Sequence, residues 1–209
     1  MTAALSAPPA ITAVLLCGGR ASRMGGRDKG LIEWQGQPLA QHALRRLRRQ
    51  SLPLARIAIS ANRNLAAYAA FGCPVWTDVI ADFPGPLGGI FTALGHCSTP
   101  LLLAVPCDVP LFPRTLCARL LAAMQRSGAP LAVATTPGAL QPVFCLMQRN
   151  VRGNLAAYLE AAGKHGVRRW QQQCGAVLAP FKSDAMFTGC NTPHELAALT
   201  ATHASRSFI

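Results

Sequence analysis

The fold of this chain is decided by the stretch from Leu15 to Leu31, which reads L-L-C-G-G-R-A-S-R-M-G-G-R-D-K-G-L. An apolar run at residues 11–16 leads into it and has the composition of a buried parallel strand. A long loop rich in glycine follows and ends before the next helix. Glycine has no Cβ atom, so this backbone can take positive φ angles and bring its N–H groups against an anion or a flat base. The stretch therefore predicts a strand, a ligand-binding loop and a helix.

The same loop carries four cationic side chains, namely Arg20, Arg23, Arg27 and Lys29. Guanidinium forks and a lysine ammonium both suit phosphate oxygens. Lys29 is followed by Gly30 and Leu31, so the loop is not a P-loop, and it also lacks the G-x-G-x-x-G of dinucleotide-binding folds. A basic surface loop without function is the alternative. The length of the loop, and its position between a strand and an amphipathic helix, favour nucleotide binding.

Length and composition indicate one globular domain in a reducing compartment. The 209 residues suit a single domain with a sizeable core. We expect neither a membrane helix nor a signal peptide, because no apolar run is long enough and the first ten residues lack a basic segment. A cytoplasmic protein is therefore expected, with poorly ordered ends at residues 1–9 and 201–209. The eight cysteines form no C-x-x-C pair, which predicts free thiols instead of a zinc site or disulfides.

A formal net charge of +12 raises the question of nucleic-acid binding. Its distribution argues against that role, because the basic residues are spread along the chain and no aromatic platform accompanies them. The densest group, expected on the outward side of one helix, is Arg45, Arg46, Arg48 and Arg49. This group is either a solvated helix face or part of a positive field that attracts polyanionic small molecules.

Acidic residues are scarce, and half of the eight fall in loops expected at the carboxyl ends of strands: Asp28, Asp78, Asp82 and Asp108. Asp108 follows the apolar run 101–105 directly, and open α/β sheets bind ligands at such positions. Because Mg²⁺ is commonly held by one or two carboxylates with water and phosphate oxygens, Asp108 is the candidate metal ligand. The alternative is a helix N-cap, since Pro110 and Pro113 mark a helix start nearby.

Strands and helices alternate along the whole chain, which predicts a three-layer α/β/α domain with a Rossmann-like, mostly parallel sheet. The expected strands are 11–16, 56–60, 74–76, 101–105, 131–135 and 143–147. The expected helices are 38–50, 65–71, one ending near 97, 114–126 and 153–162. An irregular stretch around Arg168 and Arg169 and a last helix with a capping box, Thr192 to Glu195, complete the chain.

Several motifs resemble those of the molybdenum cofactor guanylyltransferases, within the wider nucleotidyltransferase group. They are the loop from Leu16 to Leu31, D-F-P-G-P-L-G-G-I at Asp82–Ile90, P-C-D-V-P at Pro106–Pro110, Q-P-V-F at Gln141–Phe144 and N-T-P-H-E-L at Asn191–Leu196. Cys17 stands where that family usually has Ala, a small apolar exchange. The resemblance covers nearly the whole chain, and it implies one nucleotidyltransferase domain over residues 1–209.

The resemblance implies an enzyme that transfers GMP from GTP to the terminal phosphate of molybdenum-bearing molybdopterin, with Mg²⁺ as cofactor. The implied roles are guanine and ribose recognition by the backbone of Leu16, Cys17, Gly18 and Gly19, binding of the leaving phosphates by Arg23 and Lys29, and metal binding by Asp108. Asp78 would contact the nucleoside, although a turn cap is equally compatible with its position. A further nucleotide contact falls on Ser60 or, by a different alignment, on Asn62.

Molybdopterin contacts are implied for Gln141, Pro142, Arg168 and Asn191. Gly189 departs from the family pattern, since many relatives have an asparagine there. Proteins of molybdenum cofactor biosynthesis and chaperones of acceptor enzymes are further candidate partners. A cytidylyltransferase or a sugar-phosphate nucleotidyltransferase is the nearest alternative, and a nucleotide- or nucleic-acid-binding module is the alternative without catalysis. The combination of Lys29 with Asp108 favours an enzyme.

Overall fold

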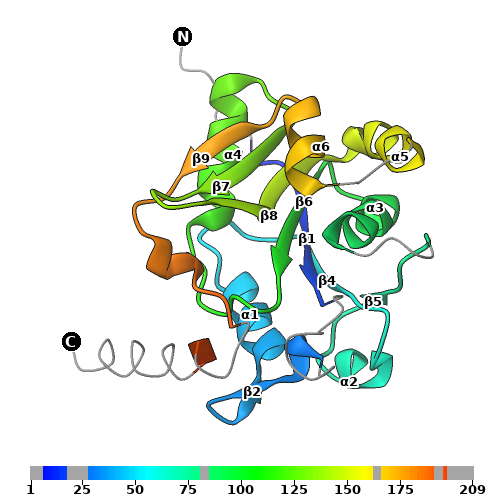
Figure 1. Ribbon diagram of the computed structural model, residues 1–209, viewed down its shortest axis with the longest axis vertical. Coiled ribbons are helices and arrows are strands. Elements are labelled where there is room, and N and C mark those ends of the chain that lie inside the picture. Colours follow the sequence, from blue (N-terminus) through cyan, green and yellow to red (C-terminus); the bar gives the residue numbers. More distant parts are fainter. Residues whose placement is uncertain (1–6, 18–27, 81–84, 162–165, 191–194, 197–209) are drawn as a thin grey trace.

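The computed structural model describes residues 7–17, 28–80, 85–161, 166–190 and 195–196. Its centre is a seven-stranded sheet with the order β5-β4-β1-β6-β8-β7-β9 (Figure 1). The strands are β1 (Ile11–Leu16), β4 (Arg56–Ser60), β5 (Val75–Trp76), β6 (Leu101–Pro106), β7 (Leu131–Thr135), β8 (Leu140–Gln148) and β9 (Val177–Pro180). Every residue of β1 is buried, as expected for a strand covered on both faces.

The sheet is mostly parallel, which confirms the expected class. β1 pairs in parallel with β4 and β6, β4 pairs with β5, and β7 pairs with β9. β8 runs antiparallel to both of its neighbours. The cause is the short connection from β7 to β8, which is closed by a hydrogen bond from the Thr136 N–H to the Ala139 carbonyl, because a parallel pair would need a long crossover.

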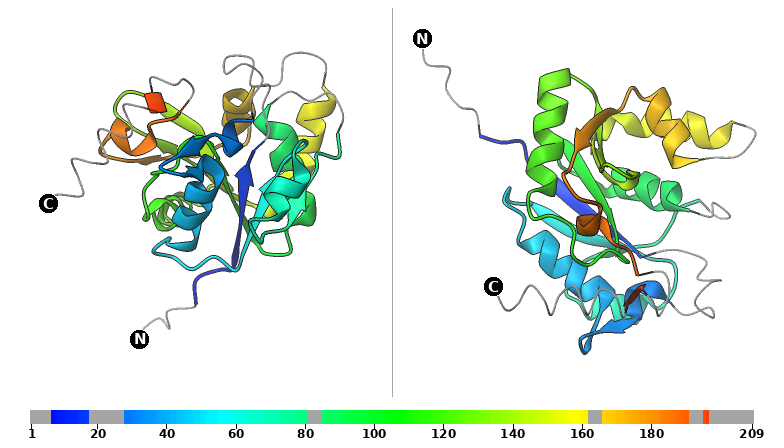
Figure 2. Two further views of the ribbon diagram at one scale, coloured as in Figure 1. Left: turned by 90° about the horizontal axis from the view of Figure 1, so that it is seen from below. Right: turned by 60° about the vertical axis from the view of Figure 1, so that its left-hand side comes forward.

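Helices cover both faces of the sheet and make the three expected layers (Figure 2). They are α1 (Leu39–Arg48), α2 (Leu65–Ala69), α3 (Pro86–His96), α4 (Leu116–Ser127), α5 (Arg152–Glu160) and α6 (Val167–Gln173). The buried side chains of α1 and α4 share one core cluster with alternate residues of β1 and β6, such as Leu15 and Leu103. The buried side chains of α3, α5 and α6 pack on the opposite face, against Val14 and Leu102.

Two predictions about local structure were wrong, and one strand was missed. Arg168 and Arg169 lie in helix α6 instead of an irregular stretch, because the fully buried Trp170 anchors that helix and its indole N–H donates to Asn154 of α5 at 3.0 Å. β8 begins at Leu140, three residues before the expected start, since a register shift between Val133 and Ala134 lets the β7–β8 pairing continue. The four-residue strand β9 was missed.

A small two-stranded ribbon was also missed. It consists of β2 (Glu33–Trp34) and β3 (Gln37–Pro38), which pair antiparallel. The two turn residues between them, Gln35 and Gly36, both have positive φ, which is the geometry of the tightest hairpins. The capping box at Thr192 falls outside the described residues. Of the ends expected to be poorly ordered, 1–9 and 201–209, only residues 7–9 are described.

Candidate active site

The predicted site residues meet at one edge of the sheet because three parallel strands end side by side. Leu16, the last residue of β1, is in register with Ser60 of β4 and with Pro106 of β6. The backbone continues this pairing past the strands, since the Cys17 N–H donates to the Ser60 carbonyl at 2.8 Å. The loops that follow β1, β4 and β6 therefore share one edge, which is the ligand-binding edge of open α/β sheets.

Lys29 and Asp108 meet at this edge. The Lys29 ammonium lies 3.4 Å from Asp108 Oδ2, with side-chain exposures of 29% and 22%. Lys29 belongs to a single 3-10 turn, η2 (Lys29–Leu31), that follows the glycine-rich loop. Two of the three predicted catalytic residues are thus in contact and open to solvent, while Arg23 lies outside the described residues. The other loop members of the predicted site, Gly18 and Gly19, also lie outside them.

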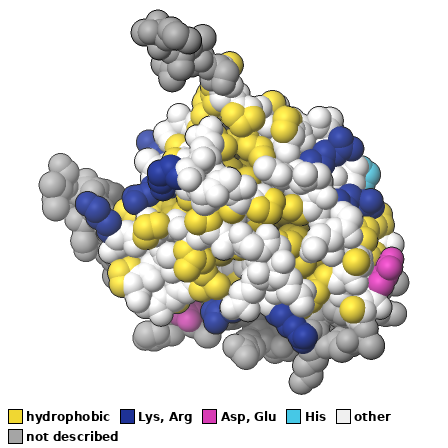
Figure 3. Space-filling model, turned by 90° about the horizontal axis from the view of Figure 1, so that it is seen from above, with side chains coloured by type: hydrophobic (Ala, Val, Ile, Leu, Met, Phe, Trp, Pro, Cys, Tyr) yellow, Lys and Arg dark blue, Asp and Glu magenta, His cyan; other side chains and the backbone are white. Residues whose placement is uncertain are grey.

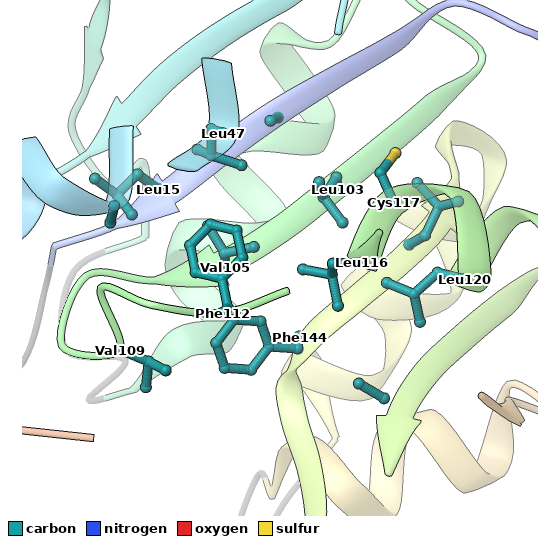
Figure 4. Packing of buried hydrophobic residues seen from close by; sticks show 14 of the residues in the cluster. Leu15, Leu47, Leu103, Val105, Val109, Phe112, Leu116, Cys117, Leu120 and Phe144 are labelled. Carbon is teal, nitrogen blue, oxygen red and sulfur yellow. The ribbon is translucent and has the colours of Figure 1, made fainter. Parts of the chain in front are cut away.

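Asp108 is held by a turn that the core fixes on both sides. Val109 and Phe112 follow it and are buried, and Phe112 packs against Phe144 with ring centroids 5.6 Å apart (Figure 4). The Asp108 carbonyl accepts a hydrogen bond from the Cys190 N–H at 2.8 Å. Asp108 does not cap the next helix, because α4 begins at Leu116 with Thr115 as its N-cap residue. The helix-cap alternative for Asp108 is therefore wrong, and its carboxylate pairs with Lys29.

The residues around Asp108 fit Mg²⁺ held by one protein carboxylate. No group of three or more His, Cys, Asp or Glu side chains that could hold a metal occurs in the part of the chain that the structure describes. A buried multi-ligand site of the zinc type is therefore not formed there. The Asp108 carboxylate already attracts a cationic group and is partly open to water, and Mg²⁺ usually keeps several waters and binds phosphate oxygens as well.

A second polar group lies between the ends of β4 and β5. Asp78 accepts hydrogen bonds from the Ser60 hydroxyl at 3.4 Å and from the Asn62 amide at 2.8 Å, and its own N–H donates to Asn62 Oδ1 at 2.8 Å. The two alternatives for the nucleotide contact, Ser60 and Asn62, thus both hold the same carboxylate. Ser60 is buried, whereas Asn62 is exposed. The side-chain partners of the Asp78 carboxylate are Ser60, at the end of β4, and Asn62, in the loop that follows. This differs from the alternative in which Asp78 caps its own turn.

Asp28 is the residue that sequence reasoning left without a role. Its Oδ1 accepts hydrogen bonds from the Tyr68 hydroxyl at 2.6 Å and from the Gly30 N–H at 3.2 Å, and its Oδ2 accepts one from the Asn64 amide at 3.0 Å. Burial, then the neighbouring Cys17 and then the bond to Asp28 raise the pKa of Tyr68, so the hydroxyl stays a donor. The sequence signals were its position beside Lys29 and its place among the four acids expected at the carboxyl ends of strands.

The predicted molybdopterin residues lie on β8 and α6. β8 is antiparallel to β6, with Cys145 opposite Ala104, so its earlier residues Gln141 and Pro142 extend toward the edge that carries Asp108. The Pro142 carbonyl accepts a hydrogen bond from Gln171 Nε2 at 2.7 Å, which places α6 beside this end of β8. Arg168 is exposed on that helix. Asn191 lies outside the described residues.

Two thiols lie under the site. Cys17 and Cys107 follow the paired ends of β1 and β6, are both buried and belong to one core cluster. The hydrogen bond between their side chains raises the pKa of Cys107 well above its ordinary value, and burial raises it further. Cys107 is therefore a neutral, packed thiol, and the small apolar role expected of Cys17 in place of Ala is compatible with its surroundings.

The basic side chains of the described residues are not all directed to solvent, nor are they gathered at one place on the edge of the sheet opposite the site. Arg46 was expected on the outward side of α1, but it is partly buried and donates to the carbonyls of Phe112 and Leu111. Figure 3 shows the opposite edge of the sheet, where basic side chains lie at separate places around an apolar surface. A groove of about 770 Å³ on that edge is lined mainly by apolar residues such as Pro100 and Met124. It is remote from Lys29 and Asp108.

Known proteins with related descriptions match this chain over most of its length. Residues 13–177 match the family model described as MobA-like NTP transferase domain. A protein of Acidovorax sp. (strain JS42) named molybdenum cofactor guanylyltransferase is 45% identical over 203 residues, which cover 90% of this chain and 94% of that protein. A protein of the same name from Bordetella pertussis is 46% identical over 193 residues, covering 90% and 96%.

Solved structures agree on the fold. The molybdopterin-guanine dinucleotide biosynthesis protein A from Archaeoglobus fulgidus superposes with a TM-score of 0.74 at 17% identity, covering 93% of this chain and 99% of that one. The structure of CMP:2-keto-3-deoxy-manno-octonic acid synthetase in complex with CTP superposes with a TM-score of 0.72 at 16% identity, covering 94% and 98%. At these identities the likeness concerns the architecture alone, and it is shared by proteins that handle different nucleotides.

Proposed function

The chain belongs to the family of MobA-like NTP transferase domains, and on that premise we propose that it transfers GMP from GTP to the terminal phosphate of molybdenum-bearing molybdopterin. An oxygen of that phosphate attacks the α-phosphorus of GTP, the bond from the α-phosphorus to the bridging oxygen breaks, and pyrophosphate leaves. The observation that carries the proposal is the contact of Lys29 with Asp108 at the carboxyl edge of the sheet. Guanine specificity is drawn from the relatives.

Lys29 and Asp108 would perform the electrostatic part of the reaction. Phosphoryl and nucleotidyl transfers depend mainly on in-line positioning and on neutralisation of charge in the transition state. Before the nucleotide binds, the two side chains neutralise each other. In the complex, Lys29 would bind the β- and γ-phosphates and stabilise the charge that develops on pyrophosphate. We predict from the sequence that Arg23 also binds the β- and γ-phosphates.

Asp108 would hold the metal that the family uses, and we assign that metal as Mg²⁺. When bound, it supplies charge neutralisation at the α-phosphate. The turn around Asp108 is fixed by Val109 and Phe112 in the core, so the carboxylate keeps its place at the strand end. Such preorganisation is what makes a charged group effective in catalysis, because it does not have to reorganise during the reaction.

The nucleoside would lie between the loop after β1 and the Asp78 group. We assign guanine and ribose recognition to the backbone from Leu16 to Gly19, and a nucleoside contact to Asp78. Asp78 is supported by Asn62 through two hydrogen bonds of 2.8 Å, which orient its carboxylate. Of the two earlier alternatives, Asn62 is better placed for direct contact because it is exposed, while the buried Ser60 supports Asp78 from below.

The acceptor is assigned to the neighbouring end of β8. Gln141 and Pro142 lie toward the same edge as Asp108, and the exposed Arg168 supplies a cation on the adjacent helix α6. Asn191, which lies outside the described residues, remains a predicted molybdopterin contact. We place the reaction in the cytoplasm, because all eight cysteines are free thiols, as is usual in a reducing compartment. Within the described residues, no helix has both the length and the apolar character needed to cross a bilayer.

One experiment tests this proposal against its alternatives. The protein is incubated with Mg²⁺, molybdenum-bearing molybdopterin and each of the four nucleoside triphosphates in turn, and pyrophosphate and the dinucleotide product are measured. The expected result is product formation with GTP in strong preference to CTP and ATP, dependent on molybdopterin. Equal or faster turnover of CTP would replace the assignment by a cytidylyltransferase. Nucleotide binding without pyrophosphate release under any condition would indicate a binding module.

A further inference from the structure

We infer that Tyr68 is a positioning residue for Lys29, acting through the carboxylate of Asp28. The inference rests on the proposed role of Lys29 at the leaving phosphates. Tyr68 lies in α2, on a different element from Lys29 and 40 positions from Asp28 in the sequence. Its hydroxyl donates to Asp28, a residue with no predicted substrate or metal contact, so we assign it an action on the reaction through the residues that it holds.

The Tyr68 side chain is a rigid anchor. It is fully buried, and its ring meets Phe71 edge to face at a centroid distance of 5.9 Å. Its hydroxyl reaches the end of the glycine-rich loop and donates to Asp28 Oδ1 at 2.6 Å. A buried phenol usually finds a polar partner, and a residue needed only to fill this space could equally be phenylalanine. The hydroxyl is therefore the part of Tyr68 that requires explanation.

Asp28 connects the Tyr68 hydroxyl to the backbone of the turn η2. The same Oδ1 that accepts from Tyr68 also accepts from the Gly30 N–H at 3.2 Å, and Oδ2 accepts from Asn64 at 3.0 Å. Three donors therefore fix one carboxylate, two of them from the region of α2 and one from the turn η2. Each such bond to a charged acceptor is stronger than a bond between neutral groups.

Gly30 gives the second contact of Tyr68 with the turn. A Cβ atom built on Gly30 would overlap the Tyr68 hydroxyl oxygen, so the backbone of the turn lies directly against it. Lys29 is thus flanked by two residues, Asp28 and Gly30, that Tyr68 holds in place. From this backbone the Lys29 side chain reaches Asp108, 79 positions away in the sequence. Loss of the hydroxyl would loosen both flanking residues at once.

The test is a double-mutant cycle with Tyr68→Phe and Lys29→Ala, measured as kcat and KM for GTP. Tyr158→Phe is the matched control, because Tyr158 is the second of the two tyrosines and its hydroxyl bonds to the Gly166 carbonyl beside α6. Tyr68→Phe should lower kcat by roughly 10- to 100-fold with little change in KM, since small misplacements of a catalytic group have effects of this size. Tyr158→Phe should leave kcat unchanged.

The cycle separates positioning from general packing. If Tyr68 acts through Lys29, then Tyr68→Phe in the Lys29→Ala background should cost less than about twofold, because coupled residues are not additive. Full additivity of the two losses, or an unchanged kcat in Tyr68→Phe alone, would overturn the inference while leaving the role of Lys29 intact. Unchanged kcat/KM in Lys29→Ala alone would overturn both the proposed phosphate contact and the inference that depends on it.

Amide hydrogen exchange gives a readout that does not depend on activity. A peptide covering residues 28–32 should exchange faster in Tyr68→Phe than in the parent protein, since the Gly30 N–H loses part of its support. Exchange of the β1 and β6 peptides should stay the same, which would exclude general loosening of the fold. Equal exchange of residues 28–32 in the parent, Tyr68→Phe and Tyr158→Phe proteins would contradict the positioning role.

Discussion

The ammonium of Lys29 lies 3.4 Å from Asp108 Oδ2, although the two residues are 79 positions apart in the sequence. The loop after β1 supplies the cation and the loop after β6 supplies the anion, and the two strands are parallel neighbours. A cation and a carboxylate at this edge of the sheet are the two charges that a nucleotidyl transfer needs, one for the leaving phosphates and one for a metal. The contact links the fold to the proposed chemistry.

Lys29→Ala should reduce kcat/KM for GTP by roughly 10²–10³, by analogy with removal of one preorganised donor to a developing charge. The melting temperature should change little, because the ion pair is partly exposed and such pairs contribute little to stability. Lys182→Ala is the control, since Lys182 is exposed beyond β9. Equal activity of the Lys29 and Lys182 variants in the pyrophosphate-release assay would remove Lys29 from the phosphate site.

Gly89→Ala should destabilise the protein and disturb the site. A Cβ atom at Gly89 would lie 2.6 Å from Ser60 Oγ and 2.9 Å from Leu16 Cδ2, so the first turn of α3 fits closely against β1 and β4. Overpacking of this kind costs about 1–3 kcal/mol of unfolding free energy. Gly153→Ala in α5 is the matched change, because no atom lies within 4 Å of its added Cβ. The measurement is the free energy of unfolding of both variants in urea. Equal values for Gly89→Ala and Gly153→Ala would refute the packing argument.

Stability should fall as the pH rises above about 9, because buried thiols resist ionisation. Burial raises the pKa of Cys117 to about 12 and that of Cys145 to about 12, from an ordinary value of 9.0. Between these values the unfolded chain releases protons that the folded chain keeps, so each thiol lowers the unfolding free energy by roughly 1.4 kcal/mol per pH unit. This contribution is fully present below pH 9 and is lost as the pH approaches 12.

The measurement is urea unfolding at several pH values from 8 to 10.5, on the parent protein and on Cys145→Val. The valine variant should show a shallower fall with pH, whatever its absolute stability, because one of the titrating thiols is gone. A slope identical to that of the parent protein would show that Cys145 ionises as easily in the folded state as in the unfolded one.

Much of the site could be predicted because parallel strands bring their carboxyl ends together. Lys29 and Asp108 fall in loops expected after apolar strands, where open α/β sheets bind ligands, and the family resemblance assigned both to one site. The Asp78 group was half predicted, since Asp78, Ser60 and Asn62 were each named as candidates without any indication that Ser60 and Asn62 both bond to Asp78. Side-chain burial, which no short motif contains, separates the two alternatives, because Ser60 is buried and Asn62 is exposed.

The remaining features depend on tertiary packing. The bond from Tyr68 to Asp28 joins residues 40 positions apart, and no local pattern marks a tyrosine whose hydroxyl has such a partner. Helix α6 forms around one buried tryptophan, so it lacks the repeating apolar pattern by which longer helices are predicted. β9 and the β2–β3 ribbon have two to four residues per strand, which is too short for a periodic signal.

The central claim is that Asp108 holds the metal for GMP transfer. The most direct measurement is transfer activity of Asp108→Asn as a function of Mg²⁺ concentration, with Glu33→Gln as the control because Glu33 is exposed on the ribbon. The substitution keeps the shape of the side chain and removes the charge that a hard cation requires. We predict a folded protein of nearly unchanged melting temperature, with activity reduced by about 10²-fold or more and only partly restored at high Mg²⁺. Full activity at low Mg²⁺, or inactivity caused only by unfolding, would contradict the assignment.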